Sequence, residues 1–408
     1  MYTLVIYLID IYLQIKGVFD LKTRTWNQKR AHQLATLKKQ MLNNDGVKII
    51  WIHCASLGEY QQIAYLISLI KSNISKVKIL LTFFSPSGFE NVKNASVDYM
   101  YYLPMDFKAH AKIYIEAFKP SLFIGVKYEW WWNLFDQLNQ YQIPKLLVAV
   151  KINKSHYIFN KFNTSFRKIL SKNSAILVQD QSTYDLLTSI NIKEIKIAGD
   201  PRIDSVLAQK TLRTNNHDDL LDIIGQQHVI IYGSVYKEDT PLIKHAIQQH
   251  ANMFHIIVPH EVSIKNIDLF LSEFNNPLLF SNIHPNNINT KVLVVDTIGS
   301  LFGLYSIAHY CYIGGGFTRN VHNVLEPAVY GLPIAIGPKH GGFTEIEYFK
   351  NHRLIEVIRK PTDFSKFVQS CDEQVRHRIR VGLGEYLDSH RGSSTIIANL
   401  IREIVYKE

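Results

Sequence analysis

The chain has 408 residues, of which 47% are hydrophobic and 20% charged, and its formal net charge is +10. This length exceeds one typical hydrophobic core and predicts two domains, while the positive charge favours a polyanionic partner. The sequence contains neither the cysteine and histidine spacing of a zinc site nor an RNA-binding signature, so we expect no nucleic acid among its partners.

The amino terminus is apolar as far as Ile15 and then becomes basic. This run contains Asp10 and is shorter than the about 20 apolar residues of a spanning helix. A narrow polar stripe is predicted on one helical face, formed by Thr3, Tyr7, Asp10 and Gln14. Basic residues follow the run, namely Lys16, Lys22, Arg24, Lys29 and Arg30. We therefore expect residues 1–22 to be an anchor helix lying in the interface of an anionic membrane surface; a helix packed on the protein's own core and a short signal-anchor are the alternatives.

Short apolar runs of β-forming residues alternate with helical stretches along the rest of the chain. In the first half they are "VKIIWIHC", "VKILLTFF", "SLFIGV", "KLLVAV" and "AILVQ". In the second half they are "HVIIYG", "FHIIVP", "KVLVVD", "HYCYIG" and "LPIAIG". Nearly continuous apolar runs are typical of parallel strands covered on both faces. The pattern predicts two doubly wound, Rossmann-like α/β domains facing a cleft, residues 23–208 and 209–408, with a polar linker near Lys210–Asp219.

Three successive glycines, Gly314–Gly316, lie between one of these runs and an expected helix. Glycine lets a ligand approach the backbone, and a helix amino terminus offers N–H groups to a phosphate; an ordinary strand-to-helix turn is the alternative. The G-x-G-x-x-G spacing of a dinucleotide fold is absent, as is a D-x-D pair that would hold a metal on a diphosphate. These features favour a nucleotide-sugar glycosyltransferase, and helix N–H groups alone can hold a donor that has one phosphate. We expect it to need no metal and no cofactor.

Nine separated segments, in order from Trp51 to Ile346, together resemble one family. They are "WIHCASLGEY", "YYLPMD", "YEWWWNL", "GDPRID", "YGS", "IVPHE", "DTIGSLFGLYSIAHYCYIGGGF", "HNVLEPAVYG" and "IGPKHGGFTEI". The chain thus resembles the 3-deoxy-D-manno-octulosonic acid (Kdo) transferases of lipopolysaccharide biosynthesis. The resemblance implies an inverting, metal-free glycosyltransferase of the GT-B type, which moves Kdo from CMP-Kdo to a lipid A precursor. It also implies that the first domain binds the acceptor and the second binds CMP-Kdo, with the last helix packing back on the first domain.

Three charged residues are expected to carry the chemistry. Glu59 follows the first strand and a glycine, at the start of a helix whose dipole keeps a carboxylate ionised. The family's proposed general base matches this position, and Ser56 and Gly58 beside it are expected to contact the acceptor. Glu129 and Arg202 match positions that support the transition state, although Lys127 and Trp132 depart from the family's usual glutamate and proline. A first-turn glutamate with only a helix-stabilising role and a surface arginine are the alternatives.

The remaining expected site residues lie at predicted strand ends and helix starts of the second domain. The resemblance implies that CMP-Kdo contacts Gly233, Ser234, Pro259, His260, Ile298, Gly299, Ser300, Gly314, Gly315, Gly316, Asn323, Val324, Leu325 and Glu326. Many relatives have arginine at the position of His260 and glutamate at that of Ser300. Asn323 and Glu326 are one helical turn apart, so both can face one ligand.

Widely separated cysteines and the absence of a cleavable export signal favour the reducing cytoplasm. Together with the anchor helix, this predicts the cytoplasmic face of the bacterial inner membrane. An enzyme of the same architecture that uses a UDP-sugar, such as a UDP-sugar 2-epimerase or a UDP-hexosamine transferase, is the alternative function.

Overall fold

The computed structural model describes residues 2–39, 46–92, 96–128, 130–160, 164–212, 218–283 and 290–406. Contacts divide the chain into two units: Met1–Ser205 with His390–Glu408, and Val206–Ser389. The first unit therefore contains the last helix of the chain as well as its amino-terminal half. Helix α9 (Pro201–Leu212) contains the boundary between the two units.

Within the described residues, the first unit holds a seven-stranded parallel sheet in the order β3-β2-β1-β4-β5-β6-β7. Its strands are β1 (Lys48–Cys54), β2 (Val77–Phe83), β3 (Tyr99–Tyr102), β4 (Leu122–Val126), β5 (Lys145–Val150), β6 (Ala175–Val178) and β7 (Ile195–Ile197). All five runs predicted as strands in this half are confirmed. The search for apolar runs misses β3 and β7, because these short outer strands carry half-buried or exposed residues.

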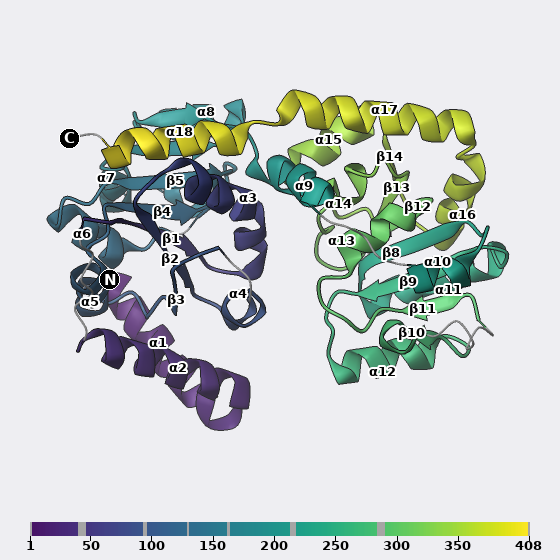
Figure 1. Ribbon diagram of the computed structural model, residues 1–408, viewed down its shortest axis with the longest axis horizontal. Helices are drawn as coiled ribbons and strands as arrows, with labels where there is room; N and C mark the ends of the chain where they lie inside the picture. The colour runs from purple at the N-terminus through teal and green to yellow at the C-terminus, as the bar shows by residue number, and fades with distance from the viewer. Residues whose placement is uncertain are drawn as a thin grey trace. The chain divides into compact units, whose positions relative to one another are not determined.

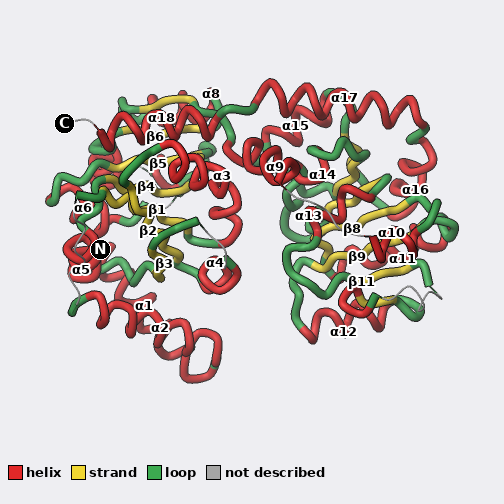
Figure 2. Tube along the Cα trace, viewed as in Figure 1, coloured by secondary structure: helices red, strands yellow, loops and turns green. Residues whose placement is uncertain are grey.

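Helices cover both faces of this sheet (Figure 2). They are α1 (Tyr2–Phe19), α2 (Leu21–Leu37), α3 (Leu57–Asn73), α4 (Pro86–Asn91), α5 (Lys108–Phe118), α6 (Trp132–Gln140), α7 (Thr164–Leu170), α8 (Gln181–Thr188) and α18 (Ser393–Tyr406). Alternate residues of β1 point to opposite faces, with Ile49 and Trp51 in one core and Ile50 and Ile52 in the other. Helix α18 packs against α3 in the second of these cores (Figure 1).

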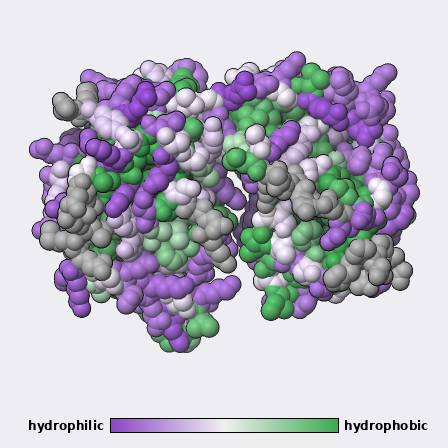
Figure 3. Space-filling view, in the orientation of Figure 1, coloured by the Kyte–Doolittle hydropathy of each residue, from purple (hydrophilic) through white to green (hydrophobic). Residues whose placement is uncertain are grey.

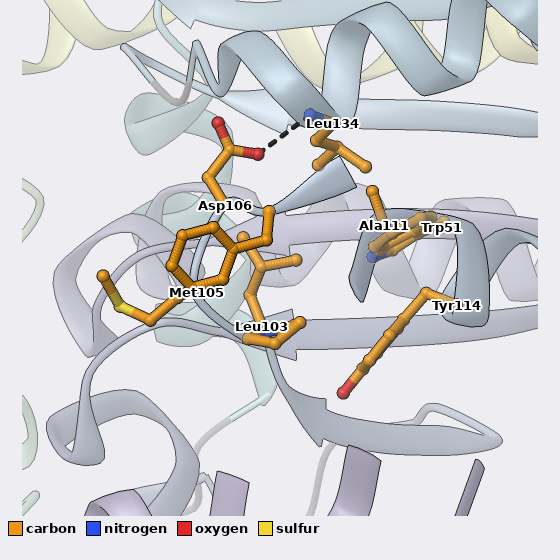
Figure 4. Close-up of a pocket in the computed structure, with 9 residues that line it drawn as sticks. Trp51, Leu103, Met105, Asp106, Ala111, Tyr114 and Leu134 are labelled. Atoms are coloured by element: carbon orange, nitrogen blue, oxygen red, sulfur yellow. Dashed lines mark hydrogen bonds between the residues drawn. The ribbon is translucent and has the colours of Figure 1, made fainter. Parts of the chain in front are cut away.

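Helices α1 and α2 form a hairpin at the amino terminus (Figure 1). The Asn27 side chain donates a hydrogen bond to the Leu13 carbonyl at 2.8 Å. Tyr2 fixes the start of α1 to the core, because its hydroxyl donates to Asp106 at 2.7 Å. Asp106 is buried and also accepts the Leu134 N–H at 2.8 Å, beside a cavity of about 10 Å³ (Figure 4).

The hairpin turns only a narrow face of α1 toward the protein. Among the described residues of this helix only Ile6 and Gly17 are buried, and Asp10 is half-buried. The other members of the predicted polar stripe, Thr3, Tyr7 and Gln14, are exposed. Asp10 therefore faces the protein, where its charge acts on the buried Arg30 guanidinium.

In the part of the chain that the structure describes, the second unit holds another seven-stranded parallel sheet, in the order β10-β11-β9-β8-β12-β13-β14. Its strands are β8 (Val229–Val235), β9 (Phe254–Pro259), β10 (Leu278–Leu279), β11 (Val292–Val294), β12 (Tyr310–Ile313), β13 (Ile334–Ile336) and β14 (Ile355–Val357). Its helices are α10 (Asp218–Ile224), α11 (Thr240–Gln249), α12 (Ile264–Glu273), α13 (Leu301–Leu304), α14 (Leu325–Ala328), α15 (Thr344–Asn351), α16 (Pro361–Ser370) and α17 (Glu373–His390). The five predicted strands are confirmed, and the two doubly wound α/β units agree with the predicted fold class.

Each sheet has a point at which the order of its strands reverses. In the first unit β2 and β4 lie on opposite sides of β1, and in the second unit β9 and β12 lie on opposite sides of β8. Because every pair of strands is parallel, all carboxyl ends of a sheet lie along one edge. Ligands of such folds bind outside this edge, beside the reversal. The fold thus predicts one binding region per unit, near the ends of β1 and β4 and of β8 and β12.

Candidate active and nucleotide-binding sites

Glu59 lies at the carboxyl edge of the first sheet, in the first turn of α3. Ser56 caps this helix, and its backbone N–H donates a hydrogen bond to Glu59 Oε2 at 2.8 Å. The Ser56 hydroxyl donates to the same oxygen at 3.3 Å. This reciprocal capping box fixes the carboxylate against the helix amino terminus. A Cβ added at Gly58 would meet only the Ser56 hydroxyl, at 3.9 Å, so Gly58 itself is not closely packed at this position.

Glu59 and two further side chains, Arg202 and Asp180, act electrostatically on one group, the phenol of Tyr128. Burial raises the pKa of Tyr128, the charge of Arg202 lowers it, and the charges of Asp180 and Glu59 raise it. Tyr128 follows β4 and donates a hydrogen bond to the Lys151 carbonyl, directly after β5. The predicted residues Glu59 and Arg202 are thus in one neighbourhood, and Tyr128 and Asp180 join them without having been singled out from the sequence.

Arg202 is less available than its sequence position indicates. Its guanidinium forms a fork with the Asp200 carboxylate, with Nε–Oδ2 at 2.8 Å and Nη2–Oδ2 at 2.5 Å. The two side chains are only 13% and 15% exposed. Asp200 therefore balances part of the charge of Arg202 and fixes its direction. Glu129 lies outside the described residues, and Trp130 beside it is buried in the core.

In the second unit, the end of β8 is distorted where the sequence predicts a ligand contact. The register of β8 against β9 shifts between Gly233 and Val235, and Ser234 takes a left-handed backbone conformation with φ of 54°. Such bulges redirect a side chain at the edge of a sheet, and non-glycine residues in this conformation cluster at functional sites. Gly233 has a packing role, because an added Cβ would collide with the Tyr305 hydroxyl.

The glycine turn after β12 is filled by the protein itself. The Gly314 N–H donates to the Gly233 carbonyl at 2.9 Å, and the Gly315 N–H points at the buried Asp239 carboxylate at 3.4 Å. A Cβ on Gly314 would lie 2.5 Å from the Ser234 carbonyl oxygen, and one on Gly316 would lie 2.6 Å from the Cα of Gly337. Close backbone packing therefore accounts for these glycines, and the amides of Gly314 and Gly315 are already engaged.

The helix expected after this turn is the short α14. Of the residues at its start, some are buried in the core and others lie at the surface. Val324 and Leu325 are buried at 1% and 0% exposure, so only their backbone is left to contact a ligand. Asn323 accepts the Leu325 N–H at 3.1 Å and donates to Glu326 Oε1 at 3.1 Å. The pair Asn323 and Glu326 thus shares one face, as the sequence spacing predicts.

The other expected donor contacts lie on two loops of the same unit. Pro259 ends β9, and His260 follows it and donates its backbone N–H to the Val235 carbonyl at 3.0 Å. In the loop before α13, Ile298 is 65% exposed and Gly299 has φ of 88°. Ser300 forms a hydrogen bond with the Thr297 hydroxyl at 2.6 Å. The roles of all these residues remain predictions.

Three aromatic rings stack beside the glycine turn. The centroids of His260 and His322 are 4.2 Å apart with an interplanar angle of 18°, and Tyr236 lies 5.0 Å from His260 and 5.5 Å from His322. These residues follow β8, β9 and β12, so they lie across the strand reversal. No periodic pattern in the sequence marks Tyr236 and His322, because three separate loops bring the rings together. Among the described residues, no group of three or more His, Cys, Asp or Glu side chains is arranged to hold a metal ion.

The first unit matches a known family by sequence. Residues 24–205 match a model of the 3-deoxy-D-manno-octulosonic-acid transferase (kdotransferase) family. The 3-deoxy-D-manno-octulosonic acid transferase of Haemophilus influenzae is 26% identical over 370 residues, which cover 86% of each chain. That of Aquifex aeolicus is also 26% identical, over 308 residues that cover 74% of this chain and 78% of the relative.

Solved structures with much lower identity share the fold. A glycosyltransferase from Rickettsia africae has a TM-score of 0.60 at 10% identity, covering 89% of this chain and all of that one. A putative UDP-N-acetylglucosamine 2-epimerase from Listeria monocytogenes has a TM-score of 0.62 at 9% identity, covering 89% of this chain and 98% of that one. Their likeness concerns the fold alone, whereas the sequence matches concern the family. By these sequence matches the chain is similar to the Kdo transferases over most of its length, and residues 24–205 match the model of that family.

Proposed function

We propose that this chain transfers Kdo from CMP-Kdo to a lipid A precursor of the lipid IVA type, in lipopolysaccharide biosynthesis. The observation that carries the proposal is the position of Glu59. Its carboxylate is held by Ser56 at the strand reversal of the first unit, within the residues that match the family. A carboxylate fixed at the carboxyl edge of the sheet is suited to accept a proton from a sugar hydroxyl.

We propose the following transfer step. Glu59 accepts the proton of the acceptor's primary hydroxyl as its oxygen attacks the anomeric carbon of Kdo. The bond from that carbon to the CMP phosphate breaks on the opposite side, so the anomeric centre is inverted and CMP leaves with the bonding electrons. Arg202, directed by Asp200, and Glu129 support the charge that develops in the transition state. Ser56 and Gly58 line the acceptor side.

The donor is proposed to bind the second unit at the ends of β8, β9 and β12. Ser234 and His260 lie at two of these ends, and the Asn323–Glu326 pair offers an amide and a carboxylate. A carboxylate can accept hydrogen bonds from ribose hydroxyls, and a donor with one phosphate needs no metal to balance a diphosphate. Transfer is therefore expected to continue in EDTA.

Two measurements test the function and its alternative. Mass spectrometry of the product formed from CMP-Kdo and a lipid A precursor should show an acceptor heavier by one or more Kdo residues. CMP should raise the unfolding temperature of the protein, because a ligand that binds only the folded state stabilises it. If UDP stabilised the protein and CMP did not, a UDP-sugar enzyme such as a 2-epimerase would replace this proposal.

We also propose that α1 binds a membrane at the cytoplasmic face, lying in its interface. Among the described residues, α1 is the helix long and apolar enough to span a membrane by length and composition, and only 11% of it is buried. Its apolar side chains are exposed, including Leu8 at 59%, Ile15 at 57% and Phe19 at 86%. Hydrophobic residues are visible at the end of the α1–α2 hairpin (Figure 3). An exposed apolar face of this size marks an interaction site.

The basic residues that follow α1 contribute less to membrane binding than the sequence indicates. Arg24 donates to the carbonyls of Gly17 and Val18 at 2.9 and 2.5 Å, and Lys29 pairs with Glu90 at 3.0 Å. Arg30 is buried, with its guanidinium 4.0 Å above the Trp26 ring. Binding should therefore depend more on apolar area than on ionic strength.

The triple variant Leu8→Ser, Ile15→Ser, Phe19→Ser is expected to lower binding to anionic vesicles at least about tenfold. Burying one large apolar side chain contributes roughly 1.5–3 kcal/mol to the free energy of binding, and each serine loses this contribution. The variant keeps the contacts of Tyr2 with the core, so α1 should stay in place. Ile264→Ser is the matched control, because Ile264 is 84% exposed on α12 of the second unit. Co-sedimentation with vesicles measures both proteins. Equal binding of the triple variant and the wild type would rule out α1 as the membrane contact.

A further inference from the structure

The stacked rings of Tyr236, His260 and His322 form a site that can change its charge. His260 is exposed, whereas the Nε2 atom of His322 is enclosed beside Gly315 and has no hydrogen-bond partner among the described residues. Two imidazolium rings whose centroids are 4.2 Å apart repel each other. At most one ring of the pair is therefore in the charged imidazolium form near neutral pH.

The surroundings keep this pair neutral when nothing is bound. Burial and, to a smaller extent, the neighbouring His260 together lower the pKa of His322 to about 4. Burial also lowers the pKa of His260, with Glu261 raising it and Arg319 lowering it. Burial raises the pKa of Tyr236, Arg319 lowers it, and the carboxylates of Glu261, Asp239 and Glu238 raise it. Both histidines are therefore mostly uncharged at pH 7 in the free protein.

We propose that the His260–His322 pair, with Tyr236, holds the phosphate of the donor nucleotide and takes up one proton as this phosphate binds. The inference rests on the proposed CMP site and adds His322 and Tyr236 to it. A phosphate beside His260 stabilises the imidazolium, and the faces of His322 and Tyr236 favour a cation stacked on them. A site that can switch its charge in this way binds the anion strongly and releases the nucleotide when the proton leaves.

The sign of the pH effect follows from the two states of the pair. The pKa values in the free protein are below the ordinary value of 6.5, and a bound phosphate raises that of the protonated ring. Between the free and bound pKa values, binding takes up a proton. Affinity therefore rises as the pH falls through this window, by up to about tenfold per pH unit for one proton. Above the bound pKa, affinity levels off at its lower value.

Calorimetry of CMP binding to the full chain tests this inference. The titrations are done between pH 6.5 and 8.5, each in two buffers of different ionisation enthalpy, which gives the number of protons taken up on binding. We expect the wild type to take up a proton and to lose affinity as the pH rises. His260→Arg supplies a permanent charge at an exposed position, so its affinity should change with pH only as far as the nucleotide's own phosphate titrates. His322→Gln should take up less proton than the wild type, because His260 loses the ring face that favours its imidazolium when the phosphate is bound.

Two controls make the result specific. His228 and His309 form a second stacked pair, with centroids 4.4 Å apart, beside the opposite ends of β8 and β12, so His228→Gln should behave as the wild type. Cytidine, which lacks the phosphate, should bind without proton uptake. Equal proton uptake by the wild type and His260→Arg would overturn the inference while leaving the CMP site intact. Failure of CMP to bind at any pH would overturn the inference together with the proposed function.

Discussion

Glu59→Gln is expected to lower the rate of Kdo transfer by about a hundred- to ten-thousand-fold, the usual contribution of a positioned base. A sugar hydroxyl is a poor nucleophile at neutral pH, and an amide cannot accept its proton. Glutamine is accepted in a capping box in place of glutamate, so the Ser56 N–H keeps a partner and α3 keeps its cap. Transfer is measured with CMP-Kdo and a lipid A precursor, and CMP affinity should not change.

The variant Ser56→Ala separates two roles of the Ser56–Glu59 pair, namely capping helix α3 and accepting the proton. Loss of an N-cap hydroxyl typically costs about 1 kcal/mol of stability, and Glu59 loses the hydroxyl that donates to it at 3.3 Å. This variant should be less stable than Glu59→Gln and yet transfer Kdo faster. If Glu59→Gln kept near-normal turnover, Glu59 would be only a capping residue, and Glu129 would be the next carboxylate to test.

The sequence predicts the central part of each sheet well and its margins poorly. Central parallel strands are covered on both faces, so β1 and β8 are almost continuously apolar and easily recognised. The outer strands β7 and β14 keep exposed residues, and their apolar runs are too short to be distinctive. The same reasoning places Glu59 and His260 correctly at strand ends, because a residue's distance along the chain from a strand fixes its place at the sheet edge.

Side-chain partners that come from distant loops could not be predicted in this way. Nothing in the local sequence indicates that Asp10 turns toward the protein, where its charge acts on Arg30. The stack of His260 on His322 depends on two loops that the fold brings together from positions far apart in the chain. Such contacts decide the charge of a site, which is why the sequence identifies its location better than its electrostatics.

Gly316→Ala is expected to destabilise the second unit by about 3 kcal/mol, the upper end of ordinary overpacking. Its added Cβ would lie 2.6 Å from the Cα and 2.8 Å from the N of Gly337, and these are backbone atoms that no rotamer change can move. The turn cannot shift freely, because the Gly316 carbonyl accepts the Lys339 N–H at 2.8 Å. Urea unfolding monitored by circular dichroism measures the free energy of unfolding.

Gly341→Ala is the matched control, since a Cβ there meets no atom within 4 Å. Its stability should stay the same or rise by up to about 1 kcal/mol, because alanine restricts the unfolded chain. The pair of variants also decides what the three glycines do. If they serve close packing, Gly316→Ala loses stability and the folded fraction still binds CMP. If Gly316 instead admits the phosphate, the variant keeps its stability and loses CMP affinity, and the contact of Gly316 with Gly337 then has little energetic weight.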